Sequence, residues 1–163
     1  MTVLVTIGVY GWTLDAFLAA LRRANVRRLL DVRQRRGVRG SEYAWANSKR
    51  LQAALAGAGI EYEHLPELAP TTELRHLQYA EDARRGVGKR SRERLAPEYA
   101  ERFTRERLDL VDLEPVVASM PPDGATALLC VERDPEACHR SLVAQRMADE
   151  FGIALEHLRP DPG

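Results

Sequence analysis

The chain has 163 residues, of which 45% are hydrophobic and 29% are charged, and its 24 basic and 24 acidic residues give a formal net charge of zero. This size fits one domain with its own core, spanning 1–163. Zero net charge argues against nucleic-acid binding through overall charge. The apolar runs are too short to cross a membrane and the N-terminus lacks a signal-peptide pattern, so we expect a cytoplasmic protein without a membrane partner.

Strand and helix patterns alternate in the first part of the chain. A β-branched run over 3–7 ends at Gly8 and predicts a buried strand. Thr13 is placed to cap the helix that follows, whose apolar residues recur at spacings of three and four. The remaining predictions here are a helix end near Asn25, a short strand at 29–32, a polar loop at 34–40, a helix at 48–58 and a strand at 60–65.

The second part begins with a charged segment, 71–120, that shows no strand pattern and predicts a helical insertion. An apolar strand is expected at 125–131 and another at 153–158. Between them, Asp134 as N-cap and Pro135 as first helical residue predict a helix to about Phe151. This alternation indicates a three-layer α/β fold, with a mostly parallel sheet of about five strands and helices on both faces.

Polar residues follow the predicted strands at the ends where open parallel sheets bind ligands. Thr6 and Gly8 end the first strand, Asp31 and Arg33 the second, and Tyr62 and His64 the third, while Cys130 ends the fourth. If these strands are parallel neighbours, the polar groups share one rim although they lie far apart in sequence.

The stretch "CVERDPEACHR" at 130–140 carries the chain's two cysteines, Cys130 and Cys138. In a reducing compartment we expect free thiols. A thiol near a helix N-terminus and beside His139 and Arg140 suits a nucleophile, although cysteine is also a common buried hydrophobe. The spacing matches neither a phosphatase loop nor a redox pair. A zinc site would need a distant fourth ligand such as His64 or His157, so no metal is expected.

Asp31 lies within an apolar run, where an ionised carboxylate needs a partner. Arg33, two residues on, points to the same side of the strand. Asp31 is therefore either a catalytic carboxylate or the partner that orients Arg33 or Arg140. His139 is either a general acid or base or a neutral hydrogen-bonding group, since the neighbouring arginine and the helix N-terminus disfavour its protonation.

Basic residues concentrate in segment 22–50, which holds ten arginines and lysines against two acidic residues, a formal charge of +8. The remainder of the chain therefore carries −8. Such polarisation suggests a basic face that meets an anion, while a general preference for arginine is the alternative explanation.

Four segments resemble the family called domain of unknown function 488 (DUF488): "VTIG", "LLDVR", "LQAALAGAGIEYEHLPEL" and "ALLCVERDPEACHRSLVA". The resemblance covers about 3–68 and 125–158 and implies a small cytosolic prokaryotic α/β domain with no agreed reaction. Two departures are Gly8-Val9-Tyr10 in place of Gly-His-Ser and Leu68-Ala69-Pro70 in place of Leu-Gly-Gly. The shared polar positions are Thr6, Gly8, Asp31, Arg33, His64, Cys130, Cys138, His139 and Arg140.

The leading functional hypothesis is a pocket at the strand carboxyl ends that binds a phosphate-bearing or other anionic ligand, such as a nucleotide or a nucleic-acid end. Arg33 and Arg140 would hold the anion with Thr6, Gly8 and His64 nearby. Asp31, Cys130, Cys138 and His139 are the candidate catalytic residues. The alternative is a non-enzymatic nucleic-acid-binding module that uses segment 22–50. No cofactor is expected, and the sequence leaves open whether the protein is an enzyme.

Overall fold

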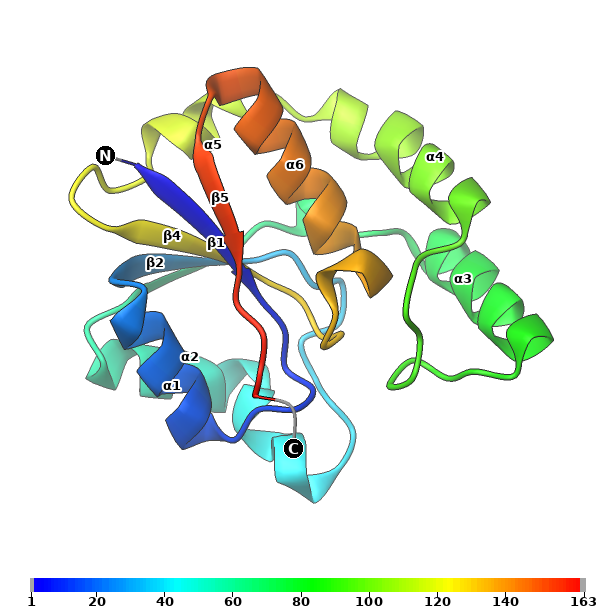
Figure 1. The fold of residues 1–163 in the computed structure, drawn as a ribbon, viewed down its shortest axis with the longest axis horizontal. Coiled ribbons are helices and arrows are strands. Elements are labelled where there is room, and N and C mark those ends of the chain that lie inside the picture. Colours follow the sequence, from blue (N-terminus) through cyan, green and yellow to red (C-terminus); the bar gives the residue numbers. More distant parts are fainter. Residues whose placement is uncertain (1, 162–163) are drawn as a thin grey trace.

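A computed structural model describes residues 2–161 and contains one five-stranded sheet in which every strand is parallel to its neighbours (Figure 1). The strands are β1 (Val3–Ile7), β2 (Val26–Asp31), β3 (Glu61–His64), β4 (Ala125–Leu129) and β5 (Ala154–His157), in the spatial order β3-β2-β4-β1-β5. The prediction of a mostly parallel sheet of about five strands is confirmed. Central β4 is buried along its whole length, as expected for a parallel strand covered on both faces.

Helices cover both faces of the sheet, which confirms the three-layer arrangement. Helices α1 (Leu14–Arg23) and α2 (Ser48–Gly57) pack on one face, and α6 (His139–Phe151) packs on the other against β1 and β4 (Figure 1). Thr13 caps α1 as predicted, because its hydroxyl accepts a hydrogen bond from the Ala16 N–H. The face of α1 that carries Phe17 and Leu21 is fully buried.

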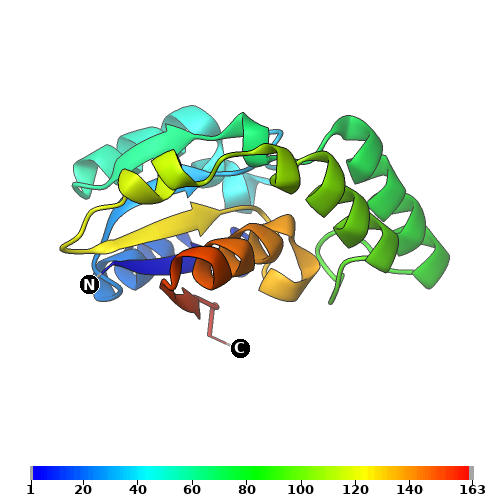
Figure 2. The same ribbon diagram turned by 90° about the horizontal axis from the view of Figure 1, so that it is seen from above.

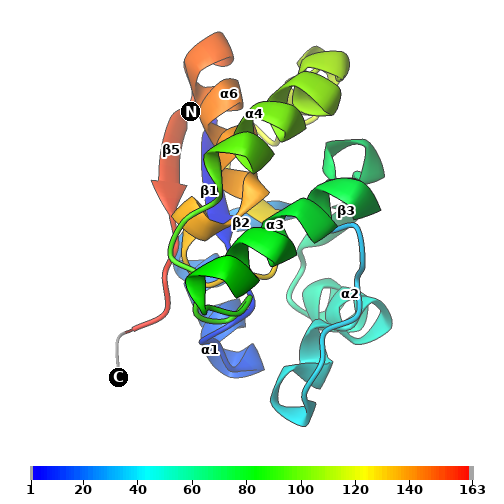
Figure 3. The ribbon, with the colours of Figure 1, turned by 90° about the vertical axis from the view of Figure 1, so that its right-hand side faces the viewer.

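The predicted helical insertion consists of α3 (Thr72–Arg85), α4 (Pro97–Glu106) and the short α5 (Glu114–Ala118), with a 3-10 turn at Leu108–Leu110. Helices α3 and α4 lie beyond the carboxyl ends of the strands rather than over a face of the sheet (Figure 2). Viewed from that end, they stand in front of the sheet (Figure 3). Thr71 caps α3, and Gly86 ends it in the left-handed conformation that favours glycine.

Several element boundaries differ from the sequence-based predictions. The helix expected from Pro135 is instead a 3-10 turn, Pro135–Ala137, and α6 begins at His139 with Cys138 as its N-cap. Strand β4 ends at Leu129, so Cys130 lies just after it. Strand β2 starts three residues earlier than predicted, and further 3-10 turns form at Ser41–Ala46 and Pro66–Leu68.

Among the helices of residues 2–161, none combines the length and the apolar character that a membrane crossing requires.

Candidate functional site

A cavity of about 710 Å³ lies at the carboxyl end of the sheet, under the insertion. Three parts of the chain form most of its walls: the segment after β2 (33–39), the insertion (75–79 and 88–95), and the segment after β4 (130–139). Tyr10, Pro70 and Tyr99 complete the lining. The insertion therefore closes a rim that the strand ends alone would leave open.

Two thiols and an imidazole lie together at the wall formed by segment 130–139. The Nδ1 atom of His139 is 3.7 Å from the Sγ of Cys130 and 3.9 Å from the Sγ of Cys138. The Nε2 atom lies 2.7 Å from the carbonyl oxygen of Val32, to which it donates a hydrogen bond. All three residues are buried yet line the cavity, and both cysteines are free thiols.

The local fold brings the two cysteines together across seven intervening residues. Cys130 leaves β4, the chain turns through Pro135–Ala137, and Cys138 then starts α6 beside the strand it came from. The insertion holds this turn in place, because the Leu95 N–H donates a hydrogen bond to the carbonyl of Glu136. The sequence spacing thus resembles no short metal or redox motif, although the side chains meet.

The pKa values of the three groups are shifted by burial and by their contacts with one another. Burial raises the pKa of the Cys130 thiol well above its ordinary value. Burial also opposes ionisation of Cys138, but hydrogen bonding from Cys130 and the nearby charges of His139 and Arg140 outweigh it and lower the pKa of Cys138 well below the ordinary range.

The pKa of His139 is raised, because Cys138 outweighs the effect of burial. The sequence predicts that the neighbouring arginine and the helix N-terminus disfavour protonation of His139, but the net shift of its pKa is in the opposite direction. The cause is the contact with the adjacent Cys138, a partner of opposite charge that the expectation left out.

Asp31 and Arg33 form a buried bidentate ion pair. The Asp31 carboxylate accepts from Arg33 Nε and Nη2, both at 2.9 Å, and from the Tyr62 hydroxyl at 2.6 Å. The Arg33 Nη1 atom donates to the carbonyl of Ala46, while His64 bonds the carbonyl of Arg33. Of the two roles considered for Asp31, the orientation of Arg33 is the one seen in these contacts.

Tyr62→Phe should lower the free energy of unfolding by about 1–2 kcal/mol, because a buried carboxylate loses one of its donors. Burial and the bond to Asp31 raise the pKa of Tyr62, so its hydroxyl is protonated and donates at neutral pH. Urea unfolding of the two proteins measures the difference. An equal midpoint and slope for both would show that the hydroxyl is replaceable by water.

Four of the nine predicted site residues line the cavity: Arg33, Cys130, Cys138 and His139. The other five do not. Arg140 is fully buried behind the wall and donates to the carbonyls of Glu132 and Arg133, and the Thr6 hydroxyl bonds His157. Gly8 packs against the Glu132 backbone, while Asp31 and His64 face Arg33.

Sequence reasoning missed the basic residues that the insertion contributes. Within residues 2–161, seven lysines and arginines line the cavity against one acidic residue, Glu132. The sequence does contain a signal for them, because Lys89 and Arg90 directly follow the two glycines, Gly86 and Gly88, that end the helix. The lining basic residues are Arg33, Arg35, Arg39, Arg75, Lys89, Arg90 and Arg92.

Arg92 ties the insertion to the wall that carries the thiols. Its guanidinium binds Asp82 of α3 at 2.7 Å, Glu132 at 3.1 Å and the carbonyl of Ala137 at 3.1 Å, and it is almost entirely buried. Burial raises the pKa of Glu132, whereas Arg92 opposes that rise. The network joins the insertion to residues 132–137 by charge-assisted bonds.

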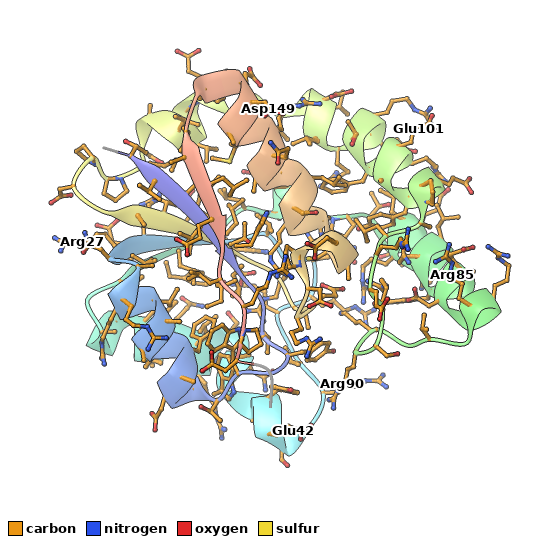
Figure 4. All side chains as sticks on the ribbon, in the orientation of Figure 1. Arg27, Glu42, Arg85, Arg90, Glu101 and Asp149 are labelled. Carbon is orange, nitrogen blue, oxygen red and sulfur yellow. The ribbon has the colours of Figure 1, made fainter. Side chains whose placement is uncertain are left out.

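The loop after α3 crosses to the basic segment at the cavity mouth. Arg90 pairs with Glu42 at 3.0 Å, and both side chains are labelled in Figure 4. The same guanidinium lies over the rings of Tyr10 and Tyr43, 5.1 and 5.2 Å from their centroids. Arg90 thus connects the loop after α3 to the other side of the cavity through one acidic partner, Glu42, and two aromatic partners, Tyr10 and Tyr43.

The parallel sheet, its helical layers and the cavity at the strand ends place this chain among three-layer α/β proteins. The family described as "Domain of unknown function DUF488" matches residues 13–147, and the chain belongs to that family. The resemblance inferred from the sequence segments is therefore confirmed. Neither the search of curated proteins nor the search of solved structures found a match.

Proposed function

We propose that the cavity binds a phosphate-bearing ligand, such as a nucleotide or a nucleic-acid end, and presents it to the thiol and imidazole groups on its wall. The observation that carries this proposal is the unbalanced charge of the lining. In the described part of the chain, the side chains of Arg35, Arg39 and Lys89 have no hydrogen bond or ion pair. Arg75 binds only the neutral side chains of Gln34 and Tyr79.

Lys89 is the strongest anion-binding candidate among these groups. It is partly buried and lies near Glu132 and the Cys130 thiol. Burial disfavours its charge, but Glu132 and the other nearby groups outweigh burial and raise the pKa of Lys89 above its ordinary value. An ammonium group that stays charged with few protein partners is available to a phosphate.

We therefore assign the binding of the anion to Arg35, Arg39, Arg75 and Lys89 rather than to Arg33 and Arg140, which the sequence suggested. The guanidinium of Arg33 is held by Asp31 and Ala46, and that of Arg140 is held by two carbonyls behind the wall. Arg33 can still face the ligand from the cavity wall, with Asp31 positioning it. For an enzymatic reaction, the proposed reacting groups are the Cys138 thiol and its partners His139 and Cys130.

Lys89→Ala should weaken binding of inorganic phosphate and of adenosine 5′-monophosphate by about 10- to 150-fold, because one charge-assisted contact contributes about 1.5–3 kcal/mol. Isothermal titration calorimetry measures both affinities. Lys49 is the matched control, since it is the chain's other lysine, is exposed on α2 and does not line the cavity. Equal losses in Lys49→Ala and Lys89→Ala, or no binding by the parent protein, would contradict the proposal.

The alternative, a nucleic-acid-binding module based on segment 22–50, gives a different pattern in the same variants. Binding of a labelled oligonucleotide would then weaken steeply with salt and would depend on Lys49 as much as on Lys89. A shallow salt dependence together with selective loss in Lys89→Ala favours the cavity.

A further inference from the structure

The three groups on the cavity wall have the spacing of a metal site. Around a tetrahedral zinc ion, with Zn–S of about 2.3 Å and Zn–N of about 2.0–2.1 Å, a nitrogen ligand lies about 3.6 Å from each sulfur. The two observed distances from His139 Nδ1, to Cys130 Sγ and Cys138 Sγ, are 3.7 and 3.9 Å. The three candidate ligand atoms all lie within 4.8 Å of one another.

The imidazole is already oriented as a metal ligand. Its Nε2–H donates to the Val32 carbonyl at 2.7 Å, so Nδ1 is the ring nitrogen on the side of the two sulfurs and, once deprotonated, the one that can bind a metal. The ring is also packed against Phe103 of α4, with centroids 5.2 Å apart. Hydrogen bonding and packing thus hold His139 in the orientation that metal-bound histidines usually have.

We propose that Cys130, Cys138 and His139 bind a thiophilic divalent cation such as Zn²⁺, with the fourth coordination position open to the cavity. Two thiolates and one neutral imidazole match the ligand preference of zinc. Two thiolates also balance the charge of the cation, so the buried centre becomes neutral. Binding releases the protons that the ligand atoms carry in the free protein, because a bound metal requires deprotonated ligands.

All three ligands line the cavity, and Glu132, whose carboxylate lies 3.6 Å from the Cys130 Sγ, lines it beside them. A fourth ligand would therefore come from water, from the bound anion or from Glu132. Three protein ligands and one open position are characteristic of catalytic rather than structural zinc sites. This inference goes beyond the proposed phosphate binding and does not depend on it. With metal bound, Cys138 would be a ligand, and the proposed thiol reaction would belong to the metal-free protein.

Co²⁺ is the probe for the test, because its thiolate complexes absorb in the near ultraviolet. We expect the reduced, chelator-treated full chain to bind one Co²⁺ with a thiolate charge-transfer band and visible bands typical of tetrahedral coordination. Zn²⁺ should displace it. The chain has no cysteine other than these two, so any thiolate band reports on this centre.

Cys130→Ser and Cys138→Ser should each lose about half of the charge-transfer intensity and weaken Zn²⁺ binding more than about 100-fold, since even outer-shell changes cost 10- to 100-fold. His76→Gln is the matched control, because this exposed histidine lines the same cavity. Its Zn²⁺ affinity should equal that of the parent. Circular dichroism shows whether each variant is folded.

If the cysteine variants do not fold, metal binding by the parent protein alone tests the metal proposal. A folded, reduced parent that shows no thiolate band at millimolar Co²⁺ overturns the metal proposal, as does full Zn²⁺ affinity in a folded Cys138→Ser variant. Calorimetry with phosphate on the metal-free protein tests the proposed function separately. Either proposal can therefore fail while the other stands.

Discussion

Asp31→Ala will lower the free energy of unfolding by about 3–5 kcal/mol, because it leaves a buried guanidinium without its counter-ion. Arg33 is 1% exposed, and its Nε and Nη2 atoms both donate to Asp31. The variant also removes the acceptor of the Arg33 N–H, which fixes the turn after β2. Urea unfolding monitored by tryptophan fluorescence measures the loss.

Two further variants distinguish the destabilisation caused by the unpaired buried charge from a nonspecific effect of substitution. Asp31→Ala combined with Arg33→Met should be less destabilised than Asp31→Ala alone, since it also removes the unpaired charge. Glu101→Ala, which breaks an exposed pair with Arg105, should change stability by no more than about 0.5 kcal/mol. Parent-like stability of Asp31→Ala would contradict the structural role and favour a purely catalytic one.

The fold was predictable because its signals are local. The apolar runs at 3–7 and 125–129 predicted buried strands and form them. Tyr62 and His64, predicted at the end of the third strand, bond Asp31 and Arg33, whereas the two glutamates of that strand pair with Arg28. The start of α6 was misplaced because Asp-Pro is a strong helix-start signal. Here it opens a 3-10 turn whose last residue, Ala137, is fully buried.

The candidate site was only half predictable from sequence. Strand-end logic correctly brought Cys130, His139 and Arg33 to one cavity, because parallel strands align their carboxyl ends. It could not place Lys89 or Arg75, whose position depends on how the insertion folds back over that edge. Nor could it distinguish Arg140 from Arg33, since only packing decides which arginine faces the cavity and which is sealed behind it.

Gly8 shows how closely the first strand and the thiol-bearing segment are packed. A Cβ atom at this position would lie 2.0 Å from the Glu132 carbonyl oxygen and 2.9 Å from its carbon. That carbonyl is itself held by Arg140 Nη1 at 2.7 Å. Backbone atoms cannot rotate away as a flexible side chain can, so segment 130–133 would have to move and would carry Cys130 with it.

Gly8→Ala will therefore destabilise the protein by about 4 kcal/mol or more, beyond the usual range for overpacking, because the clash is with backbone. Gly57→Ala is the matched control: nothing lies within 4 Å of a Cβ there, and alanine at the end of α2 should add up to about 1 kcal/mol of stability. Thermal and urea unfolding of both variants measure the contrast. A Gly8→Ala protein as stable as the parent would mean that segment 130–133 can move aside without a cost in stability.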